Sequence, residues 1–254
     1  MLIDTHSHIY STDFIQDLDE VIQRAYSNDV RKIILPNIDS SSVKNLLNLV
    51  DTYPHICIPL MGLHPTSVTH DYQEELQVVE YWLKKRKFYG IGEIGIDLYW
   101  EKSFLEEQTH AFRFQLELAR QYNLPVVIHV RDSFDEVYQV LKEVNDNNLT
   151  GVFHSFSGTI EQADMVIEMG FKIGVGGVVT FKKSGMDQVI RQINPSNLIL
   201  ETDSPYLTPV PFRGKRNESS YLVYIAQKIA DLHQMTVGEI AKITTENARK
   251  LFGI

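Results

Sequence analysis

The sequence has a single cysteine, Cys57, so an intramolecular disulfide cannot form and a secreted disulfide scaffold is excluded. No apolar run approaches the roughly 18 residues that a membrane span requires. The chain opens Met1-Leu2-Ile3-Asp4, without the basic segment that begins a signal peptide. These absences predict a globular cytoplasmic protein with no membrane partner.

Positive charge is also scarce. The 254 residues include 24 Lys and Arg against 33 Asp and Glu, a formal net charge of −9. This balance excludes bulk electrostatic binding of nucleic acid and a polybasic membrane anchor. A phosphate-bearing partner must therefore be held by a local basic patch or by a bound metal. The composition is compatible with a monomer and does not determine the oligomeric state.

Short β-rich runs alternate with longer helical patterns, and no linker or low-complexity segment divides the chain. The midpoints of the runs are spaced by roughly 28 residues, the length of a βα unit. Several runs are apolar throughout, as expected of strands that are covered on both faces. The expected strands are Leu2–Ile9, Lys32–Ile38, Ile56–Leu63, Phe88–Asp97, Leu124–Arg131, Leu149–Ser155, Phe171–Gly176 and Asn197–Asp203.

Helical periodicity is clearest over Phe104–Tyr122 and over the tail, where we expect helices at Tyr221–Gln234 and Val237–Leu251. Thr159 and Gln162 have the spacing of a capping box at the start of another helix.

Eight strands alternating with helices in a chain of this length predict a (β/α)₈ TIM barrel that forms a single domain over residues 1–254. An open doubly wound sheet is the main alternative. No Gly-x-Gly-x-x-Gly follows the first strand, so a dinucleotide site has no support, and the barrel is favoured.

His6 and His8 are the most informative residues near the start of the chain. Alternate residues of a strand point to the same face, so both imidazoles would enter the barrel together. The alternative is a pair of exposed histidines on a frayed terminal strand.

Other metal-ligating residues fall where further strands are expected to end, and barrel enzymes place their active sites at these ends. They are Glu93, His129, His154 and Asp203. A single His or Asp at a strand end is more often an ordinary polar group, but the combination is difficult to explain by packing. Four imidazoles and two carboxylates suit borderline divalent metals, and six ligands are more than one tetrahedral ion needs. Two metals bridged by a carboxylate are therefore expected.

Seven motifs in this order resemble the TatD family of metal-dependent DNases, which belongs to the amidohydrolase superfamily of TIM barrels. The motifs are Asp-Thr-His-Ser-His (4–8), Gly-Leu-His-Pro (62–65), Gly-Glu-Ile-Gly-Ile-Asp (92–97), Ile-His-Val-Arg-Asp (128–132), His-Ser-Phe-Ser-Gly (154–158), Glu-Thr-Asp-Ser-Pro (201–205) and Arg-Gly-Lys-Arg-Asn-Glu (213–218). They extend over essentially the whole chain. The last motif is often followed by proline in the family, whereas Ser219 follows it here.

The resemblance implies a metal-dependent hydrolase of DNA phosphodiesters, with 3′-to-5′ exonuclease action on single strands or frayed ends. It also implies two divalent ions, Mg, Mn or Zn. One would be held by His6, His8, Glu93 and Asp203, and the other by Glu93, His129 and His154. Related binuclear enzymes use a carboxylated lysine as the bridge. Here Lys87 precedes the strand, so Glu93 is the expected bridge.

Asp203 is the expected general base, since a carboxylate beside an activated water can accept its proton. Glu201 would share its strand face, either in the site or as a buried acid in an ion pair.

Four further residues are predicted to bind substrate, each with an alternative role. His64 touches a phosphate or supports its own loop. Arg131 suits bidentate phosphate binding, or it pairs with Asp132 or Asp135. Arg213 and Arg216, with Lys215 between them, form a basic cluster that attracts phosphates or is simply a solvated loop.

Aromatic residues in the expected βα loops either stack on bases or cover the barrel. They are Tyr99, Trp100, Phe156, Phe181, Tyr206 and Phe212. Two other functions remain open: hydrolysis of a small amide, ester or lactone by the same metals, and a catalytically silent binding barrel. A neutral substrate would have no use for the basic cluster, and a silent barrel would have no use for a complete ligand set.

Overall fold

All eight predicted strands are present in the computed structural model, which describes residues 1–144 and 149–254. The strands are β1 (Leu2–Asp4), β2 (Val30–Leu35), β3 (Cys57–Pro59), β4 (Ile91–Asp97), β5 (Val126–Arg131), β6 (Gly151–Phe153), β7 (Lys172–Val175) and β8 (Leu198–Leu200). Every neighbouring pair is parallel, in the order β1-β2-β3 and β4-β5-β6-β7-β8.

The two runs of strands join at both ends, which closes the barrel. Isolated parallel bridges link Met61 to Ile91 and Ser7 to Ser204. The amide of Thr5 also donates to the carbonyl of Leu200 at 3.0 Å. The structure is a (β/α)₈ TIM barrel, and the prediction of this fold is confirmed over the alternative of an open sheet.

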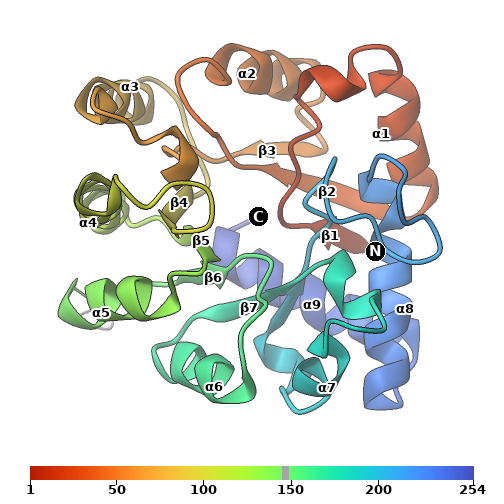
Figure 1. Ribbon diagram of the computed structural model, residues 1–254. Helices are drawn as coiled ribbons and strands as arrows, with labels where there is room; N and C mark the ends of the chain where they lie inside the picture. The colour runs from red at the N-terminus through yellow and green to blue at the C-terminus, as the bar shows by residue number, and fades with distance from the viewer. Residues whose placement is uncertain (145–148) are drawn as a thin grey trace.

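Helices surround the strands, with α1 to α8 forming the outer ring in Figure 1. They are α1 (Leu18–Ser27), α2 (Val43–Thr52), α3 (Tyr72–Lys85), α4 (Leu105–Tyr122), α5 (Phe134–Val144), α6 (Ile160–Glu168), α7 (Met186–Ile190), α8 (Leu222–His233) and α9 (Val237–Phe252). Short 3₁₀ helices span Thr12–Phe14, Pro65–Ser67, Gly177–Thr180, Pro195–Asn197 and Ser219–Tyr221. The three predicted helices match α4, α8 and α9 to within one residue at either end. The capping box of Thr159 and Gln162 is confirmed at α6.

Several strands end earlier than predicted. The prediction Leu149–Ser155 becomes Gly151–Phe153, and Asn197–Asp203 becomes Leu198–Leu200. Ser155 and Asp203 adopt φ of 44° and 58°, a left-handed conformation that cannot continue a strand. The chain therefore leaves the sheet at the residues that carry the site.

The first strand also ends early, at Asp4 instead of Ile9. His6 and His8 thus lie just beyond it. The amide of Asp203 donates to the carbonyl of His6 at 2.9 Å, and the amide of His8 donates to that of Ser204 at 2.7 Å. These bonds hold the two histidines beside the segment that follows β8.

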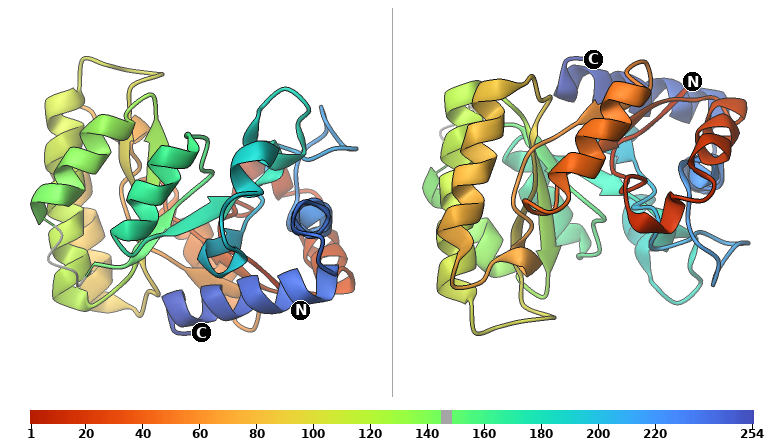
Figure 2. Two further views of the ribbon diagram at one scale, coloured as in Figure 1. Left: turned by 90° about the horizontal axis from the view of Figure 1, so that it is seen from below. Right: turned by 90° about the horizontal axis from the view of Figure 1, so that it is seen from above.

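The interior of the barrel and its base form a separate apolar cluster. Ala248 and Phe252 of α9 belong to this cluster, together with Leu60, which follows β3. The remaining members lie on the strands and are Ile3, Ile34, Ile58, Val127, Val152 and Ile199. Helix α9 lies across one end of the barrel, opposite the long loops (Figure 2). The larger cluster packs between the strands and the ring of helices. Helix α9 therefore seals the base, and the loop end is left for the site.

Within residues 1–144 and 149–254, no helix is both long and apolar enough to cross a membrane. The cytoplasmic location stays a prediction.

Replacing Phe252 with Ala should lower the free energy of unfolding by about 3–5 kcal/mol, because it empties the base of the barrel. Phe252 is 4% exposed, whereas Tyr81 on α3 is 53% exposed. Tyr81→Ala is therefore the control, with an expected change of about 0.5 kcal/mol or less. Urea titration measures both. A loss below about 1 kcal/mol for Phe252→Ala would show that α9 does not seal the core.

Candidate metal centre

The six predicted ligands come together at the loop end of the barrel. His6 and His8 follow β1, Glu93 lies on β4, His129 lies on β5, and His154 and Asp203 follow β6 and β8. Three overlapping groups have donor atoms within 4.8 Å of one another, namely His6–His8–Asp203, His6–Glu93–His154 and His64–Glu93–His129. Barrel closure thus assembles residues from both ends of the chain.

Glu93 is at the middle of this cluster, and its two oxygens face different histidines. Oε2 lies 3.0 Å from Nε2 of His6 and 3.6 Å from Nε2 of His8. Oε1 lies 2.7 Å from Nδ1 of His129 and 3.8 Å from Nε2 of His154. One carboxylate therefore connects two sets of imidazoles.

Asp203 completes the set on the side of β8. Its Oδ1 lies 3.9 Å from Nε2 of His6 and 3.7 Å from Nε2 of His8, and its Oδ2 lies 3.9 Å from Nε2 of His154. Its side chain is 13% exposed, against 3% for Glu93. Asp203 is thus the carboxylate of the pair that solvent can reach.

The backbone around Glu93 is held by neighbouring strand ends. The amide of Glu93 donates to the carbonyl of Asn37 at 3.1 Å, and the amide of Asn37 donates to the carbonyl of Gly92 at 3.0 Å. A Cβ on Gly62 would lie 2.8 Å from the carbonyl carbon of Gly92, so only glycine allows β3 and β4 to approach this closely.

Hydrogen bonds orient the ligand imidazoles from behind. The Tyr10 hydroxyl donates to the carbonyl of Pro36 at 2.5 Å, so it accepts from Nδ1 of His8 at 2.8 Å. Nε2 of His8 is then the nitrogen on the side of the cluster, in hydrogen-bond contact with Nε2 of His6 at 3.1 Å. Such an outer partner is typical of metal-ligating histidines.

Carboxylates also lie against the far side of two other histidines, as an ion pair with His154 and a hydrogen bond with His129. Oε1 of Glu201 lies 3.0 Å from Nδ1 of His154 and also accepts from the amide of Ser155. Oδ2 of Asp97 lies 2.8 Å from Nε2 of His129. The sequence analysis left Glu201 open between a site residue and an ion-paired buried acid. It is buried and supports His154.

His64 differs from the other histidines. Its Nδ1 accepts from the amide of Thr66 at 3.1 Å and so caps the 3₁₀ helix Pro65–Ser67. The proton of the neutral ring is therefore on Nε2, 3.3 Å from Oε1 of Glu93. His64 supports its loop, as one of the two predicted roles had it, and presents a donor to the centre. Contact with a phosphate stays a prediction.

Electrostatics in the cluster follow from burial among opposite charges. Burial alone would raise the pKa of Glu93, but the surrounding imidazoles outweigh it and hold the pKa well below its usual value. Burial lowers the pKa of His154, but the charges of Glu201 and Glu93 outweigh it and raise the pKa to about 10. Burial also raises the pKa of Asp203, to about 6.

This arrangement fits divalent metal ions. Imidazole nitrogens and carboxylate oxygens, the donors that borderline metals prefer, converge on one buried volume. Nδ1 of His6 is buried and has no hydrogen-bond partner among the described residues, so the ring of His6 is held by its neighbours in the cluster. The residues that would hold the ions are His6, His8, Glu93, His129, His154 and Asp203.

Asp97 and Tyr10 were not predicted as site residues. Asp97 is four residues after Glu93 on β4, and Tyr10 is two residues after His8. Asp97 shares a strand face with Glu93, since alternate residues of a strand point the same way, and that even spacing was the available signal. Tyr10 lies in the turn after His8, and only its nearness to His8 in the sequence pointed to it. Asn37 carries no comparable signal.

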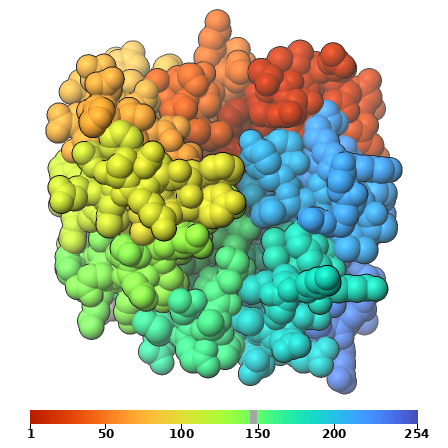
Figure 3. Space-filling model, in the orientation of Figure 1, coloured from red at the N-terminus to blue at the C-terminus, as the bar shows by residue number. Residues whose placement is uncertain are grey.

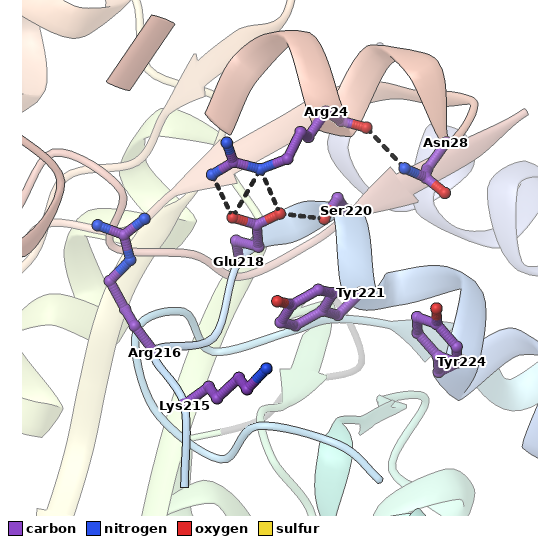
Figure 4. Close-up of a pocket in the computed structure, with 8 residues that line it drawn as sticks. All are labelled: Arg24, Asn28, Lys215, Arg216, Glu218, Ser220, Tyr221 and Tyr224. Carbon is purple, nitrogen blue, oxygen red and sulfur yellow. Dashed lines mark hydrogen bonds and ion pairs between the residues drawn. The ribbon is translucent and has the colours of Figure 1, made fainter. Parts of the chain in front are cut away.

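The two arginines of the basic cluster have different surroundings. Arg216 forms a bidentate pair with Asp17 at 2.8 and 2.7 Å, which holds the pKa of Asp17 at about 2. In Figure 4 the neighbouring Glu218 is bonded to Arg24, and the pair is 2.6 Å apart. Arg216 was predicted to bind substrate, but the structure engages its guanidinium in fastening this loop to α1.

Arg213 is exposed, and its guanidinium carbon lies 3.8 Å above the ring of Phe181. Arg131 lies 3.8 Å above the ring of Tyr99 and 5.4 Å from that of Trp100. Among the described residues Arg131 makes no ion pair with Asp132 or Asp135, the alternative considered for it. Both arginines thus stand at the rim with aromatic partners.

A protein with this fold and this donor set is a metal-dependent hydrolase. The family described as TatD related DNase matches residues 3–253. An uncharacterized metal-dependent hydrolase of Bacillus subtilis (strain 168), YabD, is 40% identical over 255 residues, covering 100% of both chains. YjjV, an uncharacterized metal-dependent hydrolase of Escherichia coli (strain K12), is 33% identical over 99% of this chain and 98% of its own.

The crystal structure of YjjV, a TatD homologue from Escherichia coli K12, superposes with a TM-score of 0.93 at 32% identity, covering 100% of this chain and 98% of the other. The chain belongs to the TatD family of metal-dependent hydrolases, as the motifs predicted.

Glu201→Gln should weaken divalent metal binding by about 10- to 100-fold, because it removes the charge that orients His154 and increases its basicity. Direct titration of the metal-free protein with Mn²⁺ or Zn²⁺ measures this. Glu117→Gln, at an exposed position on α4, is the matched control and should bind like the unchanged protein. Equal affinity in all three proteins would show that Glu201 serves packing alone.

Proposed function

We propose that this chain is a deoxyribonuclease that hydrolyses phosphodiester bonds of single-stranded DNA or frayed duplex ends, as a 3′-to-5′ exonuclease. The centre would hold two divalent ions bridged by Glu93. The observation that carries the two-ion assignment is the division of the Glu93 oxygens, with Oε2 facing His6 and His8 and Oε1 facing His129 and His154.

Bound divalent ions would polarise the phosphodiester and lower the pKa of the attacking water. Asp203 is the proposed general base, because its carboxylate is the more accessible of the two. A pKa of about 6 leaves the carboxylate ionised at neutral pH and able to accept a proton. Nε2 of His64 would donate a hydrogen bond to a phosphate oxygen.

The aromatic and basic residues around the rim favour the proposal of a single-stranded substrate. Tyr99 and Trp100 are 52% and 67% exposed, and Tyr206 is 57% exposed beside His8. Exposed aromatics with interleaved arginines are the usual means of binding single strands, since bases stack on rings while guanidinium groups contact phosphates. Figure 3 shows the hollow between these loops near the middle of the face, bordered by the yellow loop after β4 and the blue loop after β8.

Two other functions are disfavoured by the same observations. A small neutral amide, ester or lactone would gain little from Arg131 and Arg213 at the rim. A silent binding barrel would not require every ligand position, or the groups behind His8, His129 and His154, to be present.

Asp203→Asn should reduce hydrolysis of end-labelled single-stranded DNA by about 10²- to 10⁴-fold, since an amide cannot accept the proton of the attacking water. The assay compares Mg²⁺, Mn²⁺ and a chelator, and products are resolved by length. Metal content and circular dichroism are measured on the same sample. A near-normal rate with the metal retained would exclude Asp203 as the base.

Arg213→Ala should raise KM for single-stranded DNA and reduce the salt dependence of binding by roughly one counterion. Hydrolysis of a small activated phosphodiester, which lacks flanking phosphates, should change far less. Arg216→Ala is the comparison, because Asp17 already holds that guanidinium. It should leave the salt dependence unchanged. Equal losses on both substrates for Arg213→Ala would instead place this side chain on the reacting phosphate.

A further inference from the structure

A second cavity, of about 400 Å³, adjoins the metal centre between the loops that follow β5 and β6. His154 belongs to both, since it lines this cavity and its Nε2 faces Glu93 and Asp203. A group bound in the cavity would therefore be attached to, or adjacent to, the bond that the centre cleaves. The volume is near the lower end of the range for small-molecule sites, about 300–1,000 Å³, and suits one nucleoside.

The cavity is acidic at its edge and aromatic on its walls. Its edge carries Asp132, Asp135 and Glu136, and its aromatic residues are Phe134, Phe153 and Phe156. Among the described residues, none of the three carboxylates has an ion-pair or hydrogen-bond partner, and neither Lys nor Arg lines the cavity. A phosphate is repelled from such a site, whereas a flat group with N–H donors is attracted.

The cations of the rim lie elsewhere. Arg131 is next to Asp132 in the sequence, yet its guanidinium is placed over Tyr99 and Trp100 instead. Arg213 is placed over Phe181, in the loop after β7. The mouth is thus divided into a cationic part, suited to phosphates, and an acidic cavity, suited to a base.

The wall formed by the start of α6 keeps its shape through a glycine. A Cβ on Gly158 would lie 2.4 Å from Oε1 of Gln162 and 2.8 Å from Cζ of Phe156, so the side chains are packed against this residue. Oε1 of Gln162 already accepts from the amide of Thr159, which leaves the Nε2 of Gln162 as a donor. The cavity therefore offers carboxylate acceptors and one amide donor.

We propose that this cavity binds the nucleobase adjoining the scissile phosphodiester and prefers bases with an exocyclic amino group, cytosine above thymine. A carboxylate accepts hydrogen bonds from the amino group of cytosine, whereas thymine presents a carbonyl oxygen at the same position and is repelled. The amide donor suits the ring acceptors of cytosine, and the half-buried ring of Phe134 provides a surface for stacking. This inference rests on the proposed nuclease function.

The test compares four dinucleotides, d(TpT), d(CpT), d(TpC) and d(CpC), under the same Mn²⁺ conditions. Cytosine at one of the two positions should raise kcat/KM by about tenfold over thymine, the size of effect expected for one base-edge contact. The double variant Asp135→Asn/Glu136→Gln should bring this ratio close to one, because cytosine loses its acceptors and thymine is no longer repelled, so d(TpT) should be hydrolysed at least as fast as by the unchanged protein. Asp164→Asn, an exposed acid on α6 outside the cavity, should keep the full preference.

The absence of a cytosine preference at both positions would overturn the proposal, as would a preference that survives in the double variant. A loss of d(TpT) hydrolysis in a folded double variant would also overturn it, because the carboxylates would then serve the metal centre.

If no dinucleotide is hydrolysed by the unchanged protein, the nuclease function fails, and binding of deoxycytidine and thymidine to the Mn²⁺-loaded protein is measured by calorimetry. Deoxycytidine binding that the double variant loses supports the cavity as a base site. Equal or absent binding of the two nucleosides overturns it.

Discussion

The carboxylate of Glu93 is the constraint on which the rest of the site depends. A buried negative charge is costly unless it is paired, and here it is paired by imidazoles on two sides. Those imidazoles come from β5 and from the segments that follow β1 and β6, so Glu93 is held as a charge only when the barrel is closed. The same closure places Asp203 beside His6 through a backbone hydrogen bond of 2.9 Å. Folding and assembly of the metal centre are therefore one event.

The base of the barrel contributes to stability, and the opposite end, where the strands finish, carries the metal centre. Phe252 and Ala248 of α9 fill the base with apolar side chains, which supplies stability without using the mouth. At the mouth, residues with positive φ follow three of the strands, namely Asp132 after β5, Ser155 after β6 and Asp203 after β8. These turns release side chains from the alternation of a strand and let them converge. The division agrees with the general rule that barrel enzymes carry stability at one face and chemistry at the other.

Much of the barrel fold and of the metal centre could be predicted from the sequence, because strand spacing and residues at strand ends can be recognised locally. Strand spacing indicates the barrel, and the rule that polar residues at strand ends meet at one face brings His6 and Asp203 together. Strand lengths were overestimated, since nothing in the sequence marks Ser155 or Asp203 as left-handed. The pairing of Arg216 with Asp17 could not be predicted either, because it depends on how α1 packs beside the loop after β8.

The most direct test of the account is the number of metal ions held by the unchanged protein and by Glu93→Gln. Each protein is loaded with Mn²⁺ or Zn²⁺, freed of excess ion and analysed for metal content, with circular dichroism to verify folding. The account predicts two ions per chain for the unchanged protein and at most one for the variant, because the amide cannot bridge as a carboxylate does. The same metal content in both proteins, or less than one ion per chain in the unchanged protein, would contradict it.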